Sequence, residues 1–123
     1  MVPPALRTWF VVHFVADLIF ALPLLLAPVT FLGGLGWPAV DPISARLVGA
    51  ALMGIGVQSL LGRQESAEVF RAMLNLKIIW SGTASLGILV SMLQGGPLLG
   101  WGFLGIFVAF NGLWIHYRRI LGT

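Results

Sequence analysis

The sequence predicts an all-α protein, an integral membrane four-helix bundle with its N- and C-termini in the cytoplasm. The 123 residues are 59% hydrophobic and only 9% charged, whereas soluble domains carry charges at about a quarter of their positions. Four apolar segments follow one another, separated by Gly- and Pro-rich or charged stretches. A soluble domain of this size could not hide so much apolar surface. The composition therefore excludes soluble, disordered and nucleic-acid-binding classes, and makes the lipid bilayer the expected partner.

The first two segments cover residues 8–27 and 44–62. Pro23 lies in the outer half of the first segment, where it should kink the helix or loosen the residues beyond it. This segment is too long for the apolar region of a signal peptide, and no small-x-small cleavage site follows it. Pro42 lies at the entry of the second segment, where a missing N–H costs little. The connection between them is predicted to be irregular, with a turn at Gly33–Gly36.

The third and fourth segments cover residues 72–93 and 98–117. The charged stretch 62–71 precedes the third segment, and Pro97 directly precedes the fourth. Each segment is long enough to cross a hydrocarbon core about 30 Å thick. Together they predict a single transmembrane domain over residues 1–123.

The arginines predict the orientation. Only Arg46 lies near the side opposite to the termini, where it is expected to anchor at the interface, paired with Asp41. The other arginines fall on the side of the termini and the middle loop: Arg7, Arg63, Arg71, Arg118 and Arg119. Because cytoplasmic loops carry the excess of Lys and Arg, this pattern predicts a multi-pass protein of the inner (plasma) membrane. The net charge of +3 forms no basic run, so no nucleic acid is expected as a partner.

Polar side chains recur at one depth in the predicted bundle. Asp17 lies near the centre of the first segment, and His13 lies four residues earlier on the same helical face, within reach of the carboxylate. Gln58, Lys77 and Asn111 fall in the same cytoplasmic half of the other segments. A charge at such a depth costs about 2.5–3.5 kcal/mol on insertion scales, so these groups are expected to face the bundle interior and to pair. The pattern predicts a polar pocket open to the cytoplasm, in which Lys77 reaches Asp17.

Three interpretations of this cluster remain open. It either serves a substrate or a proton, or it only fixes the register of the helices. Alternatively, Lys77 extends to the interface and leaves Asp17 protonated and neutral. Trp114 fits an aromatic belt at a segment end, whereas the deeper Trp80 either walls a pocket or packs.

Several chemistries are not supported by any motif. The chain has no cysteine, no H-E-x-x-H, no G-x-S-x-G and no P-loop. His13 and Asp17 alone supply too few ligands for a metal ion. We therefore predict no catalytic residue, no metal and no cofactor.

The second segment opens with "ARLVGAALMGIG", in which Ala45 and Gly49, and then Ala50 and Gly54, stand four residues apart. With the four-segment layout, this opening resembles the small bacterial DoxX-like membrane proteins. Small residues at this spacing let helix backbones approach closely, inside one bundle or between subunits. A monomer, a homodimer and a larger membrane complex all remain open.

Two shorter pieces, "ADLIFALPLLLAP" and "NGLW", resemble the sterol-isomerase and sigma-2-receptor (EXPERA) group. The resemblance implies that Asp17 faces a membrane pocket for a hydrophobic amine or sterol, with Asn111 and Trp114 lining it. That group relies on more than one intramembrane carboxylate, whereas this chain has Asp17 alone.

The predicted function is the binding of a small hydrophobic or ionic ligand. A stronger version of this prediction is that the protein also transports the ligand, coupled to protons. One alternative is an intramembrane enzyme that modifies a lipid or isoprenoid with His13 and Asp17. Another is a structural or accessory subunit of a membrane complex. The predicted ligand-binding residues are His13, Asp17, Gln58, Lys77, Trp80, Asn111 and Trp114.

Overall fold

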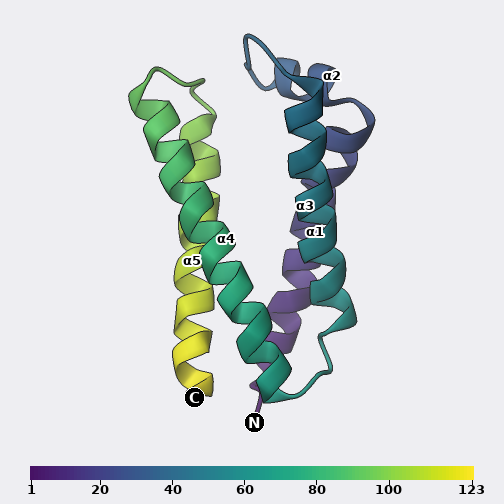
Figure 1. Cartoon of the computed structure of the whole chain (residues 1–123), viewed down its shortest axis with the longest axis vertical. Helices are drawn as coiled ribbons and strands as arrows, with labels where there is room; N and C mark the ends of the chain where they lie inside the picture. The colour runs from purple at the N-terminus through teal and green to yellow at the C-terminus, as the bar shows by residue number, and fades with distance from the viewer. The chain divides into compact units, whose positions relative to one another are not determined.

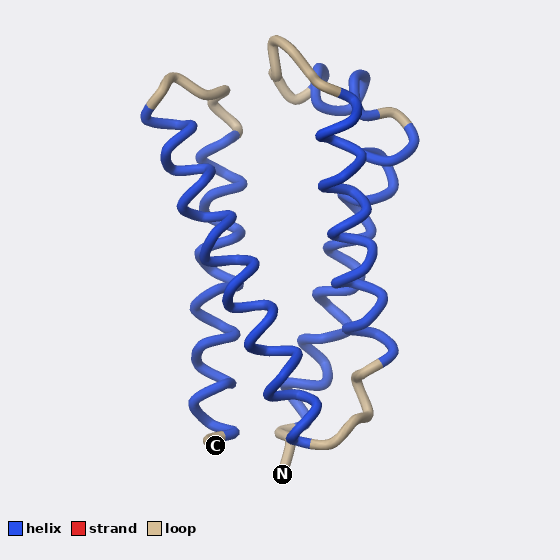
Figure 2. Tube along the Cα trace, viewed as in Figure 1, coloured by secondary structure: helices blue, strands red, loops and turns tan.

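The computed structural model describes residues 1–123, and it contains helices and loops but no strands (Figures 1 and 2). The all-helical class predicted from the sequence is therefore confirmed. Residues 3–65 form one compact unit, and residues 66–123 with Met1 and Val2 form the other. The five helices are α1 (Pro4–Leu26), α2 (Pro28–Gly34), α3 (Pro42–Leu61), α4 (Ala67–Leu93) and α5 (Gly100–Leu121).

Three helices are long and apolar enough to cross a membrane. They are α1 with 23 residues, α3 with 20 and α4 with 27. The fourth long helix, α5, has 22 residues but is not among the three. Its second half carries the polar or charged residues Asn111, His116, Arg118 and Arg119.

Helices α1, α3 and α4 begin earlier than the apolar segments predicted from the sequence. For α3 and α4 the reason is that a capping side chain, and not the first apolar residue, fixes where the helix begins, whereas α1 begins at Pro4 without a side-chain cap. Asp41 caps α3 by accepting hydrogen bonds from the Ile43 and Ser44 N–H groups, with Pro42 in the first turn. Ser66 caps α4 by accepting from the Val69 N–H (3.4 Å). The charged stretch after Ser66, predicted as a connection, is therefore the first turn of a helix.

The connection after α1 differs from the prediction. Pro23 lies inside α1, which continues to Leu26, and the short α2 follows directly. Gly33 and Gly34 are the last residues of α2 and are not part of an irregular turn as predicted. The turn itself follows, at Gly36, whose φ of 100° lies in the left-handed region that glycine adopts at no steric cost.

In the unit of residues 3–65, α1 and α3 form an antiparallel hairpin. At one end, the Arg7 guanidinium donates to the carbonyls of Arg63 (2.8 Å) and Glu65 (3.0 Å). At the other end, Arg46 Nε donates to the Leu25 carbonyl (3.0 Å). The predicted pairing of Arg46 with Asp41 is wrong, because Arg46 bonds a carbonyl near the end of α1 while the Asp41 carboxylate caps α3.

In the other unit, α4 and α5 form a second antiparallel hairpin (Figure 1). Arg118 Nε donates to the Asn75 amide oxygen (2.8 Å), and Arg71 Nη1 donates to the Leu121 carbonyl (3.4 Å). Gly95 turns the chain between the two helices with a φ of 91°. These contacts fix the level at which the side chains of α4 meet those of α5.

The two faces of α1 have the reverse of the polarity expected in water. The face that is buried carries His13 and Asp17 at three- and four-residue spacing with Leu6, Phe10 and Ala21. From Val11 onward the opposite face exposes large apolar side chains, at Val11, Val15, Ile19, Leu22 and Leu26. A helix that shows apolar groups outward and keeps its ionisable groups inside suits an apolar surrounding.

The cap at Asp41 predicts a pH-dependent stability. The Ser44 hydroxyl, followed by the Ser44 and Ile43 N–H groups, donates to the carboxylate and holds the pKa of Asp41 below its ordinary value of 3.8. The stabilisation is thus present above pH 3.8 and is lost as the pH falls through the lowered pKa. We expect Asp41→Ala to lower the melting temperature at neutral pH, and the difference from wild type to shrink in acid. Asp41→Asn, which keeps an acceptor without a titrating charge, should show a melting temperature with less dependence on acid.

Candidate functional site

The first group of candidate residues lies on α1. His13 Nε2 is 3.3 Å from Asp17 Oδ1, and the two side chains are 5% and 7% exposed. The contact predicted from their four-residue spacing is therefore confirmed. Because α1 spans Pro4–Leu26, the pair stands on either side of its middle, each residue about 3 Å along the axis from the midpoint.

The absence of a side chain at Gly56 of α3 leaves room for the Asp17 side chain. A Cβ atom placed on Gly56 would lie 2.8 Å from Asp17 Cβ and 3.3 Å from Asp17 Oδ2. No side chain fits there, so the backbone of α3 itself packs against the carboxylate. Sequence reasoning recognised the small residues of α3 as a packing signal, but it did not identify Gly56 as the neighbour of Asp17.

The second group lies in the other unit, on α4 and α5. Lys77 Nζ stands over the ring of Trp114, 4.9 Å from the centroid, and both side chains are buried. Phe110 stacks on the same indole, with 5.5 Å between ring centroids. An ammonium on the face of an indole is attracted by the ring quadrupole, by about 2 kcal/mol when the pair is desolvated. Trp114 therefore serves here as a platform for a charge and not as part of an interfacial belt.

Asn111 joins α5 to α4 next to this cation. Its Nδ2 donates to the Ile78 carbonyl and to Ser81 Oγ, both at 3.0 Å. The Ser81 hydroxyl in turn donates to the Lys77 carbonyl (2.7 Å). Ser81 is buried and was missed by sequence reasoning, although its position four residues after Lys77 places it on the same helical face.

The remaining predicted residues are Trp80 on α4 and Gln58 on α3. Trp80 is half-buried and contacts Phe107 edge to face, with 6.2 Å between ring centroids. Of its two interpretations, this contact favours a packing role over a pocket wall. Gln58 lies on an exposed face of α3, while its neighbour Ser59 is buried and donates to the Ile55 carbonyl (2.7 Å). The structure contains no group of three His, Cys, Asp or Glu side chains that could hold a metal ion.

The His13–Asp17 pair has defined chemical capabilities. A carboxylate beside an imidazole can hold one proton on either partner, and the charge of the pair then depends on pH and on ligands. Because buried surroundings screen charges weakly, the His13–Asp17 pair interacts more strongly with a charged ligand than an exposed pair would. The arrangement suits the binding of a cation or the exchange of a proton.

Comparison with protein-family models, with curated proteins and with solved structures finds no match for this chain.

Proposed function

We propose that this chain is a multi-pass protein of the inner (plasma) membrane, with α1, α3, α4 and α5 crossing the bilayer as a four-helix bundle and both termini in the cytoplasm. We further propose that it binds a small hydrophobic or ionic ligand at His13 and Asp17 and carries it across the membrane. The observation that carries this proposal is the buried contact between these two side chains in the middle of α1.

The outward face of each long helix supports a membrane location. On α4, Leu76, Ile79 and Leu86 are exposed, while Lys77 and Ser81 are buried. Monomers in water rarely expose so much contiguous apolar surface. The arginines Arg7 and Arg63, at one end of the α1–α3 hairpin, support an orientation with that end in the cytoplasm.

The cost of burying Asp17 supports a functional role. An ionisable group at the middle of a membrane helix costs about 2.5–3.5 kcal/mol, and such residues commonly mark ligand or proton pathways. A carboxylate attracts cations, and the apolar body of α1 favours a hydrophobic one. We therefore propose a lipophilic cation or amine that enters as a proton leaves the pair. The hydrophobic amine implied by the EXPERA-like pieces of the sequence belongs to this class.

The probe for this proposal is tetraphenylphosphonium, a lipophilic cation without a titrating group. Its affinity for the purified chain in detergent is measured by equilibrium dialysis. We expect saturable binding that strengthens as the pH rises, because protons compete for the pair. Asp17→Asn should weaken binding at least about tenfold, equivalent to about 1.4 kcal/mol. Glu68→Gln, which removes an exposed carboxylate in the first turn of α4, serves as the matched control and should bind as wild type does. Equal affinity of Asp17→Asn and wild type would refute the proposal.

A further inference from the structure

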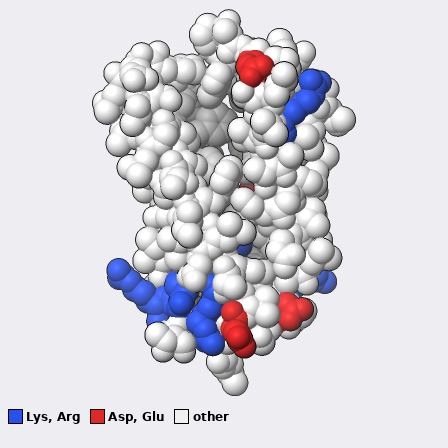
Figure 3. Space-filling model, in the orientation of Figure 1, with Lys and Arg blue, Asp and Glu red and all other residues white.

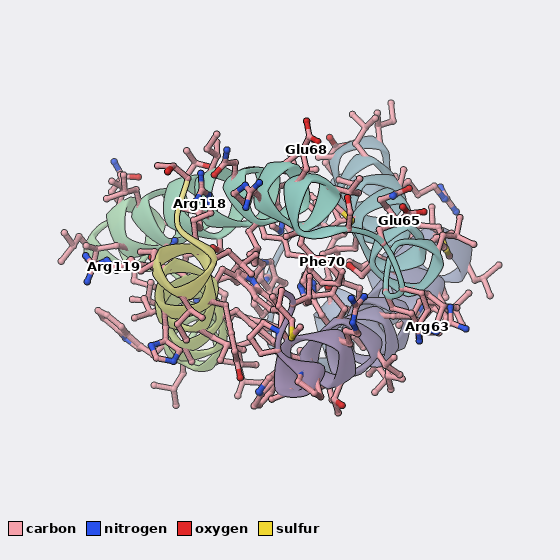
Figure 4. All side chains as sticks on the ribbon, turned by 90° about the horizontal axis from the view of Figure 1, so that it is seen from below. Arg63, Glu65, Glu68, Phe70, Arg118 and Arg119 are labelled. Atoms are coloured by element: carbon pink, nitrogen blue, oxygen red, sulfur yellow. The ribbon has the colours of Figure 1, made fainter.

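The last turn of α5 and the first turns of α4 bring three arginines to one end of their hairpin. Arg71 Nη1 donates to the Leu121 carbonyl, and Arg118 Nη1 donates to the next carbonyl along the chain, that of Gly122. Two guanidinium groups from different helices therefore converge on neighbouring backbone atoms. Arg119 follows Arg118 in the last turn of α5 and is exposed, and its side chain extends in another direction from the helix (Figure 4).

Arg71 and Arg118 form hydrogen bonds with uncharged groups and no ion pair with a carboxylate. The Arg71 guanidinium donates to a backbone carbonyl, and the Arg118 guanidinium donates to an amide oxygen and to a backbone carbonyl. The unit of residues 66–123 has one acidic residue, Glu68, against these three arginines. Figure 3 shows blue side chains gathered at the lower end of the α4–α5 pair, with red carboxylates next to them and a surface above that is almost free of charge.

We propose that Arg71, Arg118 and Arg119 bind the phosphate of an anionic lipid headgroup. A guanidinium has five N–H donors in a planar fork that matches a phosphate, and the bonds within the hairpin use only some of them. On α4, Leu76 is exposed five residues after Arg71, toward the apolar part of the helix, where the acyl chains of the same lipid would lie. The proposal rests on the membrane location given under the proposed function, and not on the ligand at Asp17.

Lipid binding to the purified chain in detergent, counted by native mass spectrometry, tests this site. The probes are phosphatidylglycerol, which is anionic, and phosphatidylcholine, which has the same phosphate but no net charge. We expect wild type to retain phosphatidylglycerol more tightly. A basic residue near an anionic lipid surface contributes about 1 kcal/mol, so Arg119→Gln should weaken phosphatidylglycerol binding about fivefold.

Two further variants separate the site from net charge. Arg46→Gln changes the net charge equally but lies near the N-terminus of α3, so it should bind phosphatidylglycerol as wild type does. Arg119→Lys keeps the charge without the fork and should fall between wild type and Arg119→Gln. The Arg119 side chain makes none of the hydrogen bonds that hold the hairpin end, so its replacement should leave the fold intact.

Three results would overturn the proposal. They are an unchanged affinity of Arg119→Gln, an equal loss in Arg46→Gln, and displacement of the lipid by inorganic phosphate, which would make a free anion the ligand. Tetraphenylphosphonium binding does not involve Arg119, so a failure here leaves the proposal at Asp17 standing. Failure of the membrane location itself would show separately, as recovery of the wild-type chain outside the membrane fraction without detergent.

Discussion

Replacing Gly56 by alanine is expected to destabilise the α1–α3 hairpin by about 1–3 kcal/mol, the usual cost of adding an atom to a filled interior. The added Cβ would lie 2.8 Å from Asp17 Cβ, so α1 and α3 must move apart. This movement would also disturb the contact of Asp17 with His13. We therefore expect both a lower melting temperature in detergent and weaker tetraphenylphosphonium binding.

Gly54, two residues earlier on α3, provides the control. A Cβ atom on Gly54 would meet nothing within 4 Å. Alanine is the better helix former by about 0.5–1 kcal/mol, so Gly54→Ala should leave stability unchanged or raise it slightly. If Gly54→Ala and Gly56→Ala lowered the melting temperature equally, the close approach at Asp17 would not be what requires glycine.

Removal of the Trp114 side chain is expected to have the largest effect in the unit of residues 66–123. Trp114→Ala should cost about 3–5 kcal/mol, the range for truncating a fully buried aromatic side chain. The indole is fully buried, stacks on Phe110 and lies under the Lys77 ammonium. Its loss leaves a cavity and removes the aromatic face on which a buried cation rests.

Unfolding by increasing denaturing detergent measures this loss, with Trp101→Ala as the control. Trp101 lies on the same helix but is 48% exposed, so its truncation removes few contacts. Trp114→Phe keeps an aromatic face and should recover part of the stability lost in Trp114→Ala. Similar losses in Trp101→Ala and Trp114→Ala would show that the packing around Lys77 contributes little.

Local sequence spacing was sufficient to predict part of the fold and of the candidate site. The length and apolarity of the segments predicted a helical chain, and the four-residue interval predicted the contact of His13 with Asp17, because both follow from the geometry of one helix. The same rule could have found Ser81, which lies one turn beyond Lys77 and bonds to its carbonyl.

Features that depend on caps or on a second helix were not predictable from spacing. The charged turn after Ser66 is helical because the serine caps it, although its residues are not apolar. Arg46 bonds Leu25, and Gly56 meets Asp17, because α1 and α3 pair in one register that the sequence of neither helix specifies. The pairing of Asp17 with Lys77, the orientation of the termini and the family resemblances stay predictions.

The central claim is that Asp17 is kept for ligand or proton exchange at a cost to the fold. The most direct measurement is the melting temperature of Asp17→Asn in detergent without ligand, taken on the same sample as its tetraphenylphosphonium affinity. We predict a melting temperature equal to or above that of wild type together with loss of binding, because the variant no longer buries an ionisable group. A lower melting temperature with unchanged binding would contradict the claim, and would assign Asp17 to holding the helices together.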